Sequence, residues 1–232
     1  MEENKILSDL LSLADAKYRD FQSRLMPNVP YERIIGIRTP ILRKYAAEIN
    51  GTPEAEKFLS SLPHRYYEEN NLHGFLIEKV RDYDKAVTLT DELLPYVDNW
   101  ATCDSISPKA FAKNLPEIRA KASEWISSGK TYTVRYGIGI LMRYFLDGDE
   151  EWVKGALDEV ASVKSDEYYI NMMCAWFFAT ALAKQYELAL PYFENGRLTN
   201  DVQSKAIRKA IESLRVSDES KAYLRNAASR NK

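Results

Sequence analysis

Cysteine is scarce in this chain of 232 residues, which contains only Cys103 and Cys174. Two cysteines argue against a disulfide framework and against a zinc site, and they favour a reducing, intracellular compartment. Long hydrophobic runs are also absent, since no apolar stretch approaches the about 20 residues that a membrane-spanning helix needs. The first five residues lack the basic-then-apolar pattern of a signal peptide, so we expect no membrane partner.

Positive charge is not in excess either. Lys and Arg total 32 against 34 Asp and Glu, and the net charge of −2 means that any surface for nucleic acid has to be a local patch. One segment fits that description. Residues 100–146 hold seven Lys and Arg against three Asp and Glu, a local charge of +4, which leaves −6 for the remainder. The rest of the composition, with 45 % hydrophobic and 28 % charged residues, is that of an ordinary soluble globular protein.

Apolar residues recur at helical spacing along nearly the whole chain, as in Leu72-Phe75-Leu76-Val80. No alternating run of Val, Ile and Thr is long enough for a strand. The pattern predicts an all-α fold of six helix pairs followed by a last helix at 217–229. The predicted pairs are 3–24 with 39–50, 53–60 with 64–80, 82–97 with 100–114, 116–128 with 132–146, 149–163 with 167–184, and 186–195 with 199–214.

The second helices of these pairs begin at intervals of 25 to 36 residues. This period is close to that of helical-repeat proteins. We therefore predict one domain over residues 1–232, built as a helical-repeat solenoid (an α–α superhelix) with a concave groove. Thr39 before Pro40 and Thr52 before Pro53 are expected N-caps. Helices are expected to stop at the glycines Gly51, Gly129, Gly148 and Gly196.

Four residues on the second helices carry the strongest functional signal. Trp100 and Asp104 fall in the third pair, Arg135 in the fourth and Trp176 in the fifth. Equivalent helices of a stacked array are neighbours, so these residues are predicted to share one inner surface. If Trp100 lies in a helix, Asp104 follows one turn later on the same side. If the segment is a loop, Asp104 is instead the N-cap of the helix that it enters.

Each of these residues also has a commonplace interpretation when it is taken alone. A single aspartate before Ser-Ile-Ser-Pro is usually a helix cap, a tryptophan flanked by two phenylalanines usually fills a core, and an arginine is usually a surface residue or a carboxylate's partner. Cys103 and Cys174 have the character of small buried hydrophobic residues, and His64 and His73 are too isolated to suggest a triad or a metal site. The combination is more informative, because a locally basic groove with exposed indoles and one carboxylate suits a polyanion that carries sugar rings.

Two motifs resemble those of the AlkD-type DNA alkylation-repair glycosylases, which are built from HEAT-like helical repeats. The first is Gly-Ile-x-Thr-Pro-x-x-Arg at 36–43, and the second is Trp-x-x-x-Asp-Ser at 100–105. The resemblance covers nearly the whole chain from Ile35 onward. The family enzyme that the sequence resembles has a further aromatic residue in its first repeat. The spacing differs here, and either Tyr18, Phe21 or neither takes that place.

The resemblance implies a role for each of the four residues. Asp104 corresponds to the catalytic carboxylate, and Arg135 corresponds to the arginine that contacts the DNA backbone beside the lesion. Trp100 and Trp176 correspond to the two indoles that pack against the sugar of the lesion. The motifs and the positive segment lead us to expect further DNA contacts from Thr39, Arg43, Lys109 and Lys113.

The function implied is hydrolytic excision of N3- or N7-alkylated purines from double-stranded DNA, by a monofunctional glycosylase that does not extrude the lesion fully into a pocket. An alkylated purine is already cationic and leaves without an acid. One carboxylate, Asp104, can therefore stabilise an oxocarbenium-like sugar and orient water, with neither a metal nor an organic cofactor. We expect a monomer that acts on DNA inside the cell. The alternative is a catalytically silent HEAT-like scaffold that binds nucleic acid or protein.

Overall fold

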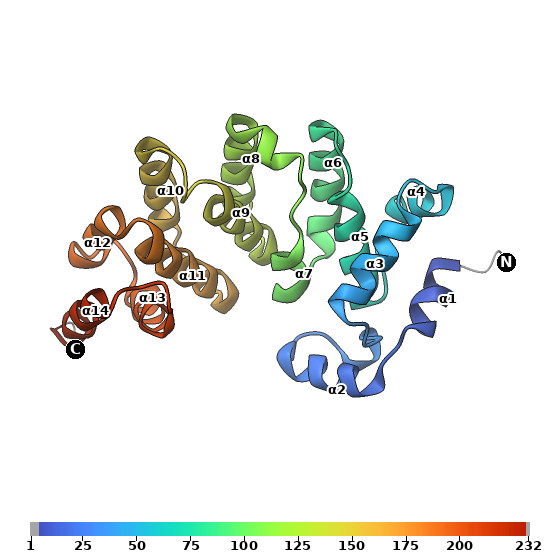
Figure 1. The fold of residues 1–232 in the computed structure, drawn as a ribbon, viewed down its shortest axis with the longest axis horizontal. Helices are drawn as coiled ribbons and strands as arrows, with labels where there is room; N and C mark the ends of the chain where they lie inside the picture. Colours follow the sequence, from blue (N-terminus) through green and yellow to red (C-terminus); the bar gives the residue numbers. More distant parts are fainter. Residues whose placement is uncertain (1–4, 231–232) are drawn as a thin grey trace. The chain divides into compact units, whose positions relative to one another are not determined.

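The computed structural model describes residues 5–230, with the side chains of 227–230 outside the description, and its secondary structure is helical (Figure 1). Fourteen α-helices occur among residues 5–230, and no strand does. The predicted all-α fold of repeated helix pairs is confirmed. Among the described helices, none combines the length and the hydrophobicity that crossing a membrane requires. The chain divides into two compact units, residues 1–114 and 115–232, which are described in turn.

Unit 1 contains seven α-helices and three short 3-10 turns within its described residues. The helices are α1 (Lys5–Ser12), α2 (Ala16–Leu25), α3 (Thr39–Ile49), α4 (Pro53–Leu59), α5 (Tyr67–Ile77), α6 (Tyr83–Leu93) and α7 (Trp100–Ser105), and the turns are η1 (Tyr31–Arg33), η2 (Leu94–Tyr96) and η3 (Phe111–Lys113). The second helices α3, α5 and α7 form a row, in which α5 packs against both of the others and against α4 and α6. As a result, every residue of α5 is buried.

One predicted helix of unit 1 is divided in two, and another begins later than expected. The helix predicted at 3–24 is two helices, because the Asp15 carboxylate accepts the N–H of Tyr18 at 3.0 Å and caps the start of α2. The helix predicted at 64–80 begins later, with α5, because the Glu69 side chain reaches back to the N–H of the N-cap residue at 2.9 Å. Both starts are fixed by a carboxylate that caps backbone N–H groups.

Two further details of unit 1 correct the sequence prediction. The helix predicted at 100–114 stops at Ser105, since the ring of Pro108 is incompatible with a continuing helix and restricts the residue before it. Thr39 is the first residue of α3 and not its N-cap, which is Arg38 and makes no side-chain capping bond.

Unit 2 contains seven α-helices within its described residues. They are α8 (Leu115–Ser127), α9 (Thr131–Tyr144), α10 (Glu150–Ser162), α11 (Tyr168–Lys184), α12 (Tyr186–Glu194), α13 (Asn200–Glu212) and α14 (Asp218–Arg230). Their bounds agree with the predicted ones to within two residues. The second helices α9, α11 and α13 form a row like that of unit 1, with α11 packed against both of the others.

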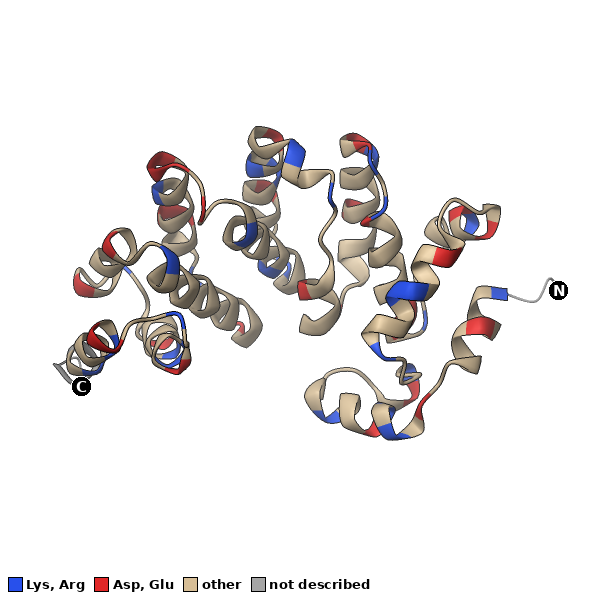
Figure 2. Cartoon of the chain, viewed as in Figure 1, with Lys and Arg blue, Asp and Glu red and all other residues tan. Residues whose placement is uncertain are grey.

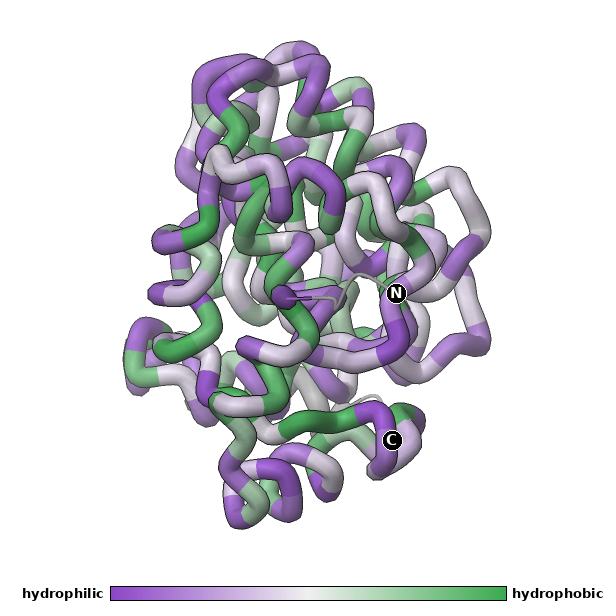
Figure 3. Tube along the Cα trace, turned by 90° about the vertical axis from the view of Figure 1, so that its right-hand side faces the viewer, coloured by the Kyte–Doolittle hydropathy of each residue, from purple (hydrophilic) through white to green (hydrophobic). Residues whose placement is uncertain are grey.

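The ends of the helices follow the expected chemistry for the most part. Gly51, Gly129 and Gly196 have φ of 83°, 71° and 64°, as predicted for residues that end a helix, whereas Gly148 does not have a positive φ. Thr52 is the N-cap of α4, as predicted, and its hydroxyl accepts the N–H of Ala55 at 3.2 Å. Hydrophilic and hydrophobic residues alternate along the helical coils (Figure 3).

Candidate functional site

The short helix α7 carries Trp100 and Asp104 one turn apart on the same side. Its N-cap is Asn99, whose side-chain oxygen accepts the N–H of Thr102 at 2.8 Å. The helical alternative is therefore confirmed, and the interpretation of Asp104 as an N-cap is wrong. Asp104 is half-buried and is the only charged residue of α7 (Figure 2).

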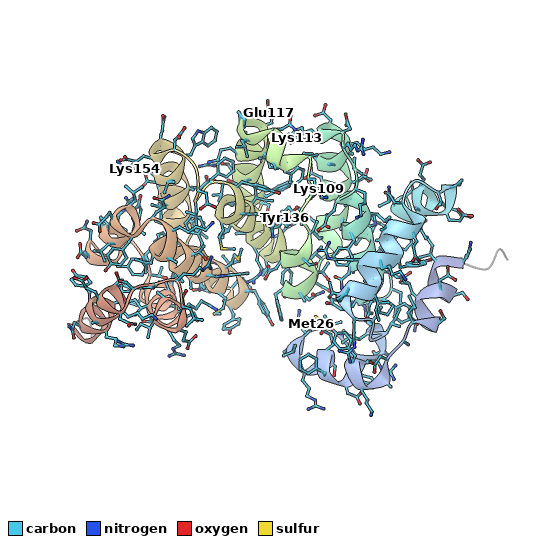
Figure 4. The ribbon with its side chains drawn as sticks, in the orientation of Figure 1. Met26, Lys109, Lys113, Glu117, Tyr136 and Lys154 are labelled. Atoms are coloured by element: carbon cyan, nitrogen blue, oxygen red, sulfur yellow. The ribbon has the colours of Figure 1, made fainter. Side chains whose placement is uncertain are left out.

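Trp100 is held both by its ring nitrogen and by packing. The Nε1–H group donates to the backbone carbonyl of Leu25, the last residue of α2, at 3.1 Å. The ring packs against a buried cluster made of Met26 (labelled in Figure 4), Val29, Ile34 and Tyr67. The indole is thus fixed in place while part of its surface stays exposed.

The chain reaches α7 through Asp98, which is tied to the loop at 28–34. Arg33 Nη1 donates to Asp98 Oδ2 at 2.7 Å, and the Asn28 side-chain amide donates to the backbone carbonyl of Asp98. The same loop supplies two members of the cluster under the indole. The start of α7 and the support for Trp100 are therefore held by one set of contacts.

A buried carboxylate holds the loop that precedes α3. The two oxygens of Glu68 accept the N–H groups of Ile35, Gly36 and Ile37 at 2.8, 2.6 and 3.2 Å. Burial raises the pKa of the Glu68 carboxyl, while these N–H donors act in the opposite direction. Gly36 has a φ of 94°, and a β-carbon there would lie 2.5 Å from the Asp15 carbonyl oxygen. Backbone geometry thus explains the glycine of the first motif.

Arg43, one of the predicted DNA contacts, is bonded within the protein. Its guanidinium donates to both oxygens of Glu78, at 2.5 and 3.3 Å, and to the carbonyl of Ser105 at 3.0 Å. Glu78 in turn accepts the N–H of Ser107 at 2.9 Å. The guanidinium carbon also lies 3.9 Å from the centroid of the Phe75 ring. These contacts reach the end of α7, immediately after Asp104.

Three other predicted DNA contacts, Thr39, Lys109 and Lys113, are exposed. Thr39 opens α3, and the two lysines lie in the segment that follows α7 (Figure 4). Neither lysine forms an ion pair within the part of the chain that the structure describes. Both ammonium groups are therefore available to an anionic ligand.

Part of the positive charge of residues 100–146 is matched by nearby carboxylates. On α8, Arg119 pairs with Glu159 of α10 at 2.5 Å, and Lys121 pairs with Glu124 at 2.8 Å. Glu124 is already counted in the local charge of +4, whereas Glu159 lies outside the segment, so the pair with Glu159 lowers the unmatched charge by one.

Arg135 lies on α9 and is buried, with 6 % of its surface exposed. Its Nη1 donates to the carbonyl of Tyr169, in the first turn of α11, at 2.8 Å. The ring of Tyr169 lies 5.7 Å from that of Tyr132 on α9. The interpretation of Arg135 as an ordinary surface residue is therefore wrong, and its contact with the DNA backbone stays a prediction.

Trp176 is 39 % exposed on α11, whereas Phe177 and Phe178 beside it are fully buried. The core interpretation therefore holds for the two phenylalanines and is wrong for the tryptophan. Trp176 follows Tyr169, which holds Arg135, by about two helical turns, so both lie on the same side of α11.

Two cations beside Trp176 were missed by the sequence analysis. A hollow of about 250 Å³ adjoins the indole and is lined by Ala179, Thr180, Lys209, Glu212, Ser213 and Arg215. Lys209 and Arg215 form no ion pair among the described residues. Lys209 lies on α13, the second helix of the sixth pair, so extending the comparison of second helices by one pair would have found it.

The two histidines, interpreted from the sequence as isolated, contact each other. His64 Nε2 lies 2.9 Å from His73 Nδ1, and the His64 ring stacks on Phe58 at 4.2 Å. Burial lowers the pKa of His64 to about 4, and burial together with the neighbouring histidine lowers the pKa of His73 to about 3. Both rings are therefore neutral at pH 7. No sequence signal pairs them, because the turn between α4 and α5 brings them together.

The cysteines match their interpretation as buried hydrophobic residues. Cys103 and Cys174 are both 1 % exposed, and burial raises the pKa of the Cys174 thiol to about 12. A thiol with so high a pKa is not a nucleophile at neutral pH. No group of three or more potential metal ligands occurs among the described residues.

Both candidates for the first-repeat aromatic residue lie on α2. Phe21 is exposed, whereas Tyr18 is half-buried with the Arg38 guanidinium 4.7 Å from its ring centroid. The last residue of the same helix, Leu25, accepts the hydrogen bond from Trp100. Phe21 is therefore the candidate whose ring is more accessible to a ligand.

The structure thus describes the four principal residues as two pairs. Trp100 and Asp104 share α7 in unit 1, while Arg135 and Trp176 lie on the adjacent helices α9 and α11 of unit 2. Within each unit, the pair lies on the row of second helices. That the two pairs share one surface stays a prediction.

The sequence was compared with curated proteins and with models of protein families. No curated protein matches the chain. A family model described as DNA alkylation repair enzyme matches residues 6–214, and the matched range includes α7, α9, α11 and α13. Because the match covers most of its length, the chain belongs to the DNA alkylation repair enzyme family.

Proposed function

We propose that this protein is a monofunctional DNA glycosylase, which excises N3- or N7-alkylated purines from double-stranded DNA. The observation that carries the proposal is the composition of α7. A half-buried carboxylate, Asp104, and an anchored, partly exposed indole, Trp100, lie one turn apart on a helix with no other charge. Alkylation repair is the role of the family, and these two residues support this particular reaction within it.

The reaction needs little from the protein besides negative charge and position. Water adds to C1′ of the deoxyribose, the glycosidic bond breaks with both electrons passing to the purine nitrogen, and the water loses a proton. Because the alkylated purine starts as a cation, it leaves as a neutral base without an acid. The carboxylate of Asp104 stabilises the positive sugar and orients the water, and an indole face favours the same cation.

Each unit has cations that suit the phosphates of DNA. Lys109 and Lys113 follow α7 directly, and Lys209 and Arg215 adjoin the exposed ring of Trp176. All four have side chains with no ion pair among the described residues. A sugar held by an indole has a phosphate on each side, so an indole with unpaired cations beside it fits a nucleotide.

The decisive experiment is single-turnover release of free base from duplex DNA that contains N7-methylguanine. Asp104→Asn keeps the size of the side chain and removes its charge, and it should slow release by about a hundredfold or more, about 3 kcal/mol of barrier. Duplex affinity should be equal or slightly higher, since a repulsion toward phosphate is lost. Asp84→Asn, which makes the same change at an exposed position on α6, is the matched control and should release base at the wild-type rate.

The same measurement separates the enzyme from a silent scaffold. A scaffold binds the duplex but leaves the lesion in place, so a wild-type protein that binds and releases no base rules out the glycosylase. If the Asp104→Asn variant keeps the wild-type rate, the catalytic carboxylate is another residue. The DNA product should contain an intact strand with an abasic site, as a monofunctional enzyme requires.

A further inference from the structure

We infer that Arg43 and Glu78 act as a positioning pair for Asp104, and that Arg43 does not serve as a phosphate contact. This role rests on the proposed function, because it gives Asp104 its catalytic task. The two residues come from different helices of the row in unit 1. Arg43 lies on α3 and Glu78 is the C-cap of α5, and both reach the end of α7.

The end of α7 depends on side chains for its hydrogen bonds. The last carbonyls of a helix have no partner within it, and α7 ends at Ser105 without a left-handed glycine to close it. The Arg43 guanidinium donates to the Ser105 carbonyl at 3.0 Å, and Glu78 accepts the N–H of Ser107 at 2.9 Å. A cation is also favoured at this end of a helix. The backbone on the C-terminal side of Asp104 is thereby held at two points.

Arg43 and Glu78 need both of their charges to hold the end of α7. The Glu78 side chain is 11 % exposed, so its carboxylate would be costly without a cation beside it. Arg43 supplies that cation in a bidentate contact and stacks on the Phe75 ring at 3.9 Å. The Arg43 side chain is 41 % exposed, but its guanidinium contacts Glu78, the Ser105 carbonyl and the Phe75 ring. Because its charge is already matched by a carboxylate, it is a poor ligand for phosphate. Its place in the first motif is explained by the contact with α7.

Two variants test the pair, and a third, at a neighbouring charge, is the control. Arg43→Met removes the guanidinium but keeps an apolar chain over Phe75, and Glu78→Gln removes the carboxylate charge but keeps its shape. Each should lower the single-turnover rate of base release by about tenfold or more, while the duplex Kd changes by less than about twofold. Lys44→Met removes a charge from the adjacent, exposed position of α3 and should change neither quantity.

Hydrogen exchange gives a readout that does not depend on catalysis. Peptides that contain Ser105 and Ser107 should exchange faster in the Arg43 and Glu78 variants than in the wild type, and at the wild-type rate in the Lys44 variant. A third test is chemical rescue. Methylguanidinium added to an Arg43→Ala variant should restore part of the rate, because the small cation can replace the missing group between Glu78 and Ser105.

Two outcomes would overturn the inference. If Arg43→Met weakens duplex binding and reduces its salt dependence while Glu78→Gln leaves the rate intact, Arg43 is a phosphate contact. If neither variant changes the exchange of the peptides around Ser105, the pair does not hold the end of α7. Failure of the proposed function looks different, since the wild type would then release no base while the exchange result still decides whether the pair holds α7.

Discussion

Glu68 is the residue on which the loop before α3 depends. It is fully buried, and its two oxygens accept three successive backbone N–H groups that no helix or sheet serves. A buried N–H group without a partner costs about 1–3 kcal/mol, so one carboxylate stabilises the loop against several such losses. The loop leads into α3, which carries Thr39 and Arg43, so Glu68 acts on the site through the backbone.

Glu68→Gln should destabilise the protein by about 2–4 kcal/mol. Glutamine has only one acceptor oxygen, so its amide group would face an N–H that a carboxylate oxygen now accepts. Glu69→Gln is the matched control, because both of its backbone bonds go to one oxygen, which glutamine retains. Urea unfolding of the two variants should show a loss below about 1 kcal/mol for Glu69→Gln. Equal losses would mean that the three N–H groups find other partners.

At the scale of the helices, the histidine pair ties the turn after α4 to α5. His64 lies in the turn and His73 in the middle of α5, and each ring is neutral because it is buried. The unfolded chain has ordinary histidine pKa values near 6.5. Between that value and about 4, the unfolded chain therefore binds protons that the folded protein does not. The contribution of the two neutral histidines to folding stability is complete above about pH 6.5, and it falls as the pH is lowered through this window.

Each histidine should remove up to about 1.4 kcal/mol of stability per pH unit in that window. His64 and His73 are the only histidines of the chain, so replacing both isolates their contribution. The variant His64→Phe/His73→Leu replaces both partners of one hydrogen bond by apolar groups. Its urea midpoint should fall less between about pH 7 and pH 5 than that of the wild type. Parallel pH curves for the two proteins would mean that the histidines titrate normally in the folded state.

The sequence predicted the helices well where local periodicity decides their limits. In unit 2 every bound was predicted to within two residues, because the apolar spacing agrees there with stop signals such as Gly129 and Gly196. It failed where a cap, a proline or a contact outside the helix decides, since none of these changes the apolar spacing. The break before α2 involves a bond from the N–H of Asp15 to the carbonyl of Gly36 at 3.0 Å, and the histidine pair depends on a turn. Neither contact leaves a periodic signal.

The sequence indicated which residues to expect in the candidate site. It did not indicate their burial or their hydrogen-bond partners. The sequence placed Trp100 and Asp104 together but left helix and loop open, and the structure shows the helix α7. The exposed Trp176 fits the sequence hypothesis. The state of the two arginines was not predictable, since a sequence gives no sign that Arg43 meets Glu78 or that Arg135 meets a backbone carbonyl. Burial of a guanidinium depends on tertiary packing, which composition and spacing do not record.

At the scale of the whole molecule, the net charge of −2 means that DNA is not attracted by the protein as a whole. Binding has to come from cations without a carboxylate partner, and these occur in both units. Lys109 belongs to unit 1 and Lys209 to unit 2, and neither forms an ion pair among the described residues. Each phosphate that such a cation neutralises releases bound counterions from the duplex.

Duplex binding should therefore weaken steeply with salt, and each neutralised phosphate contributes about −0.9 to the slope of log K against log salt concentration. Lys109→Ala and Lys209→Ala should each flatten the slope by about that amount, and by about twice as much together if both units contact one duplex. Lys154→Ala is the matched control, since this exposed lysine of α10 pairs with Glu150 at 2.5 Å and should leave the slope unchanged. If only Lys109→Ala has an effect, Lys209 does not contact a phosphate of the duplex. Binding that is indifferent to salt would exclude phosphate recognition by either unit.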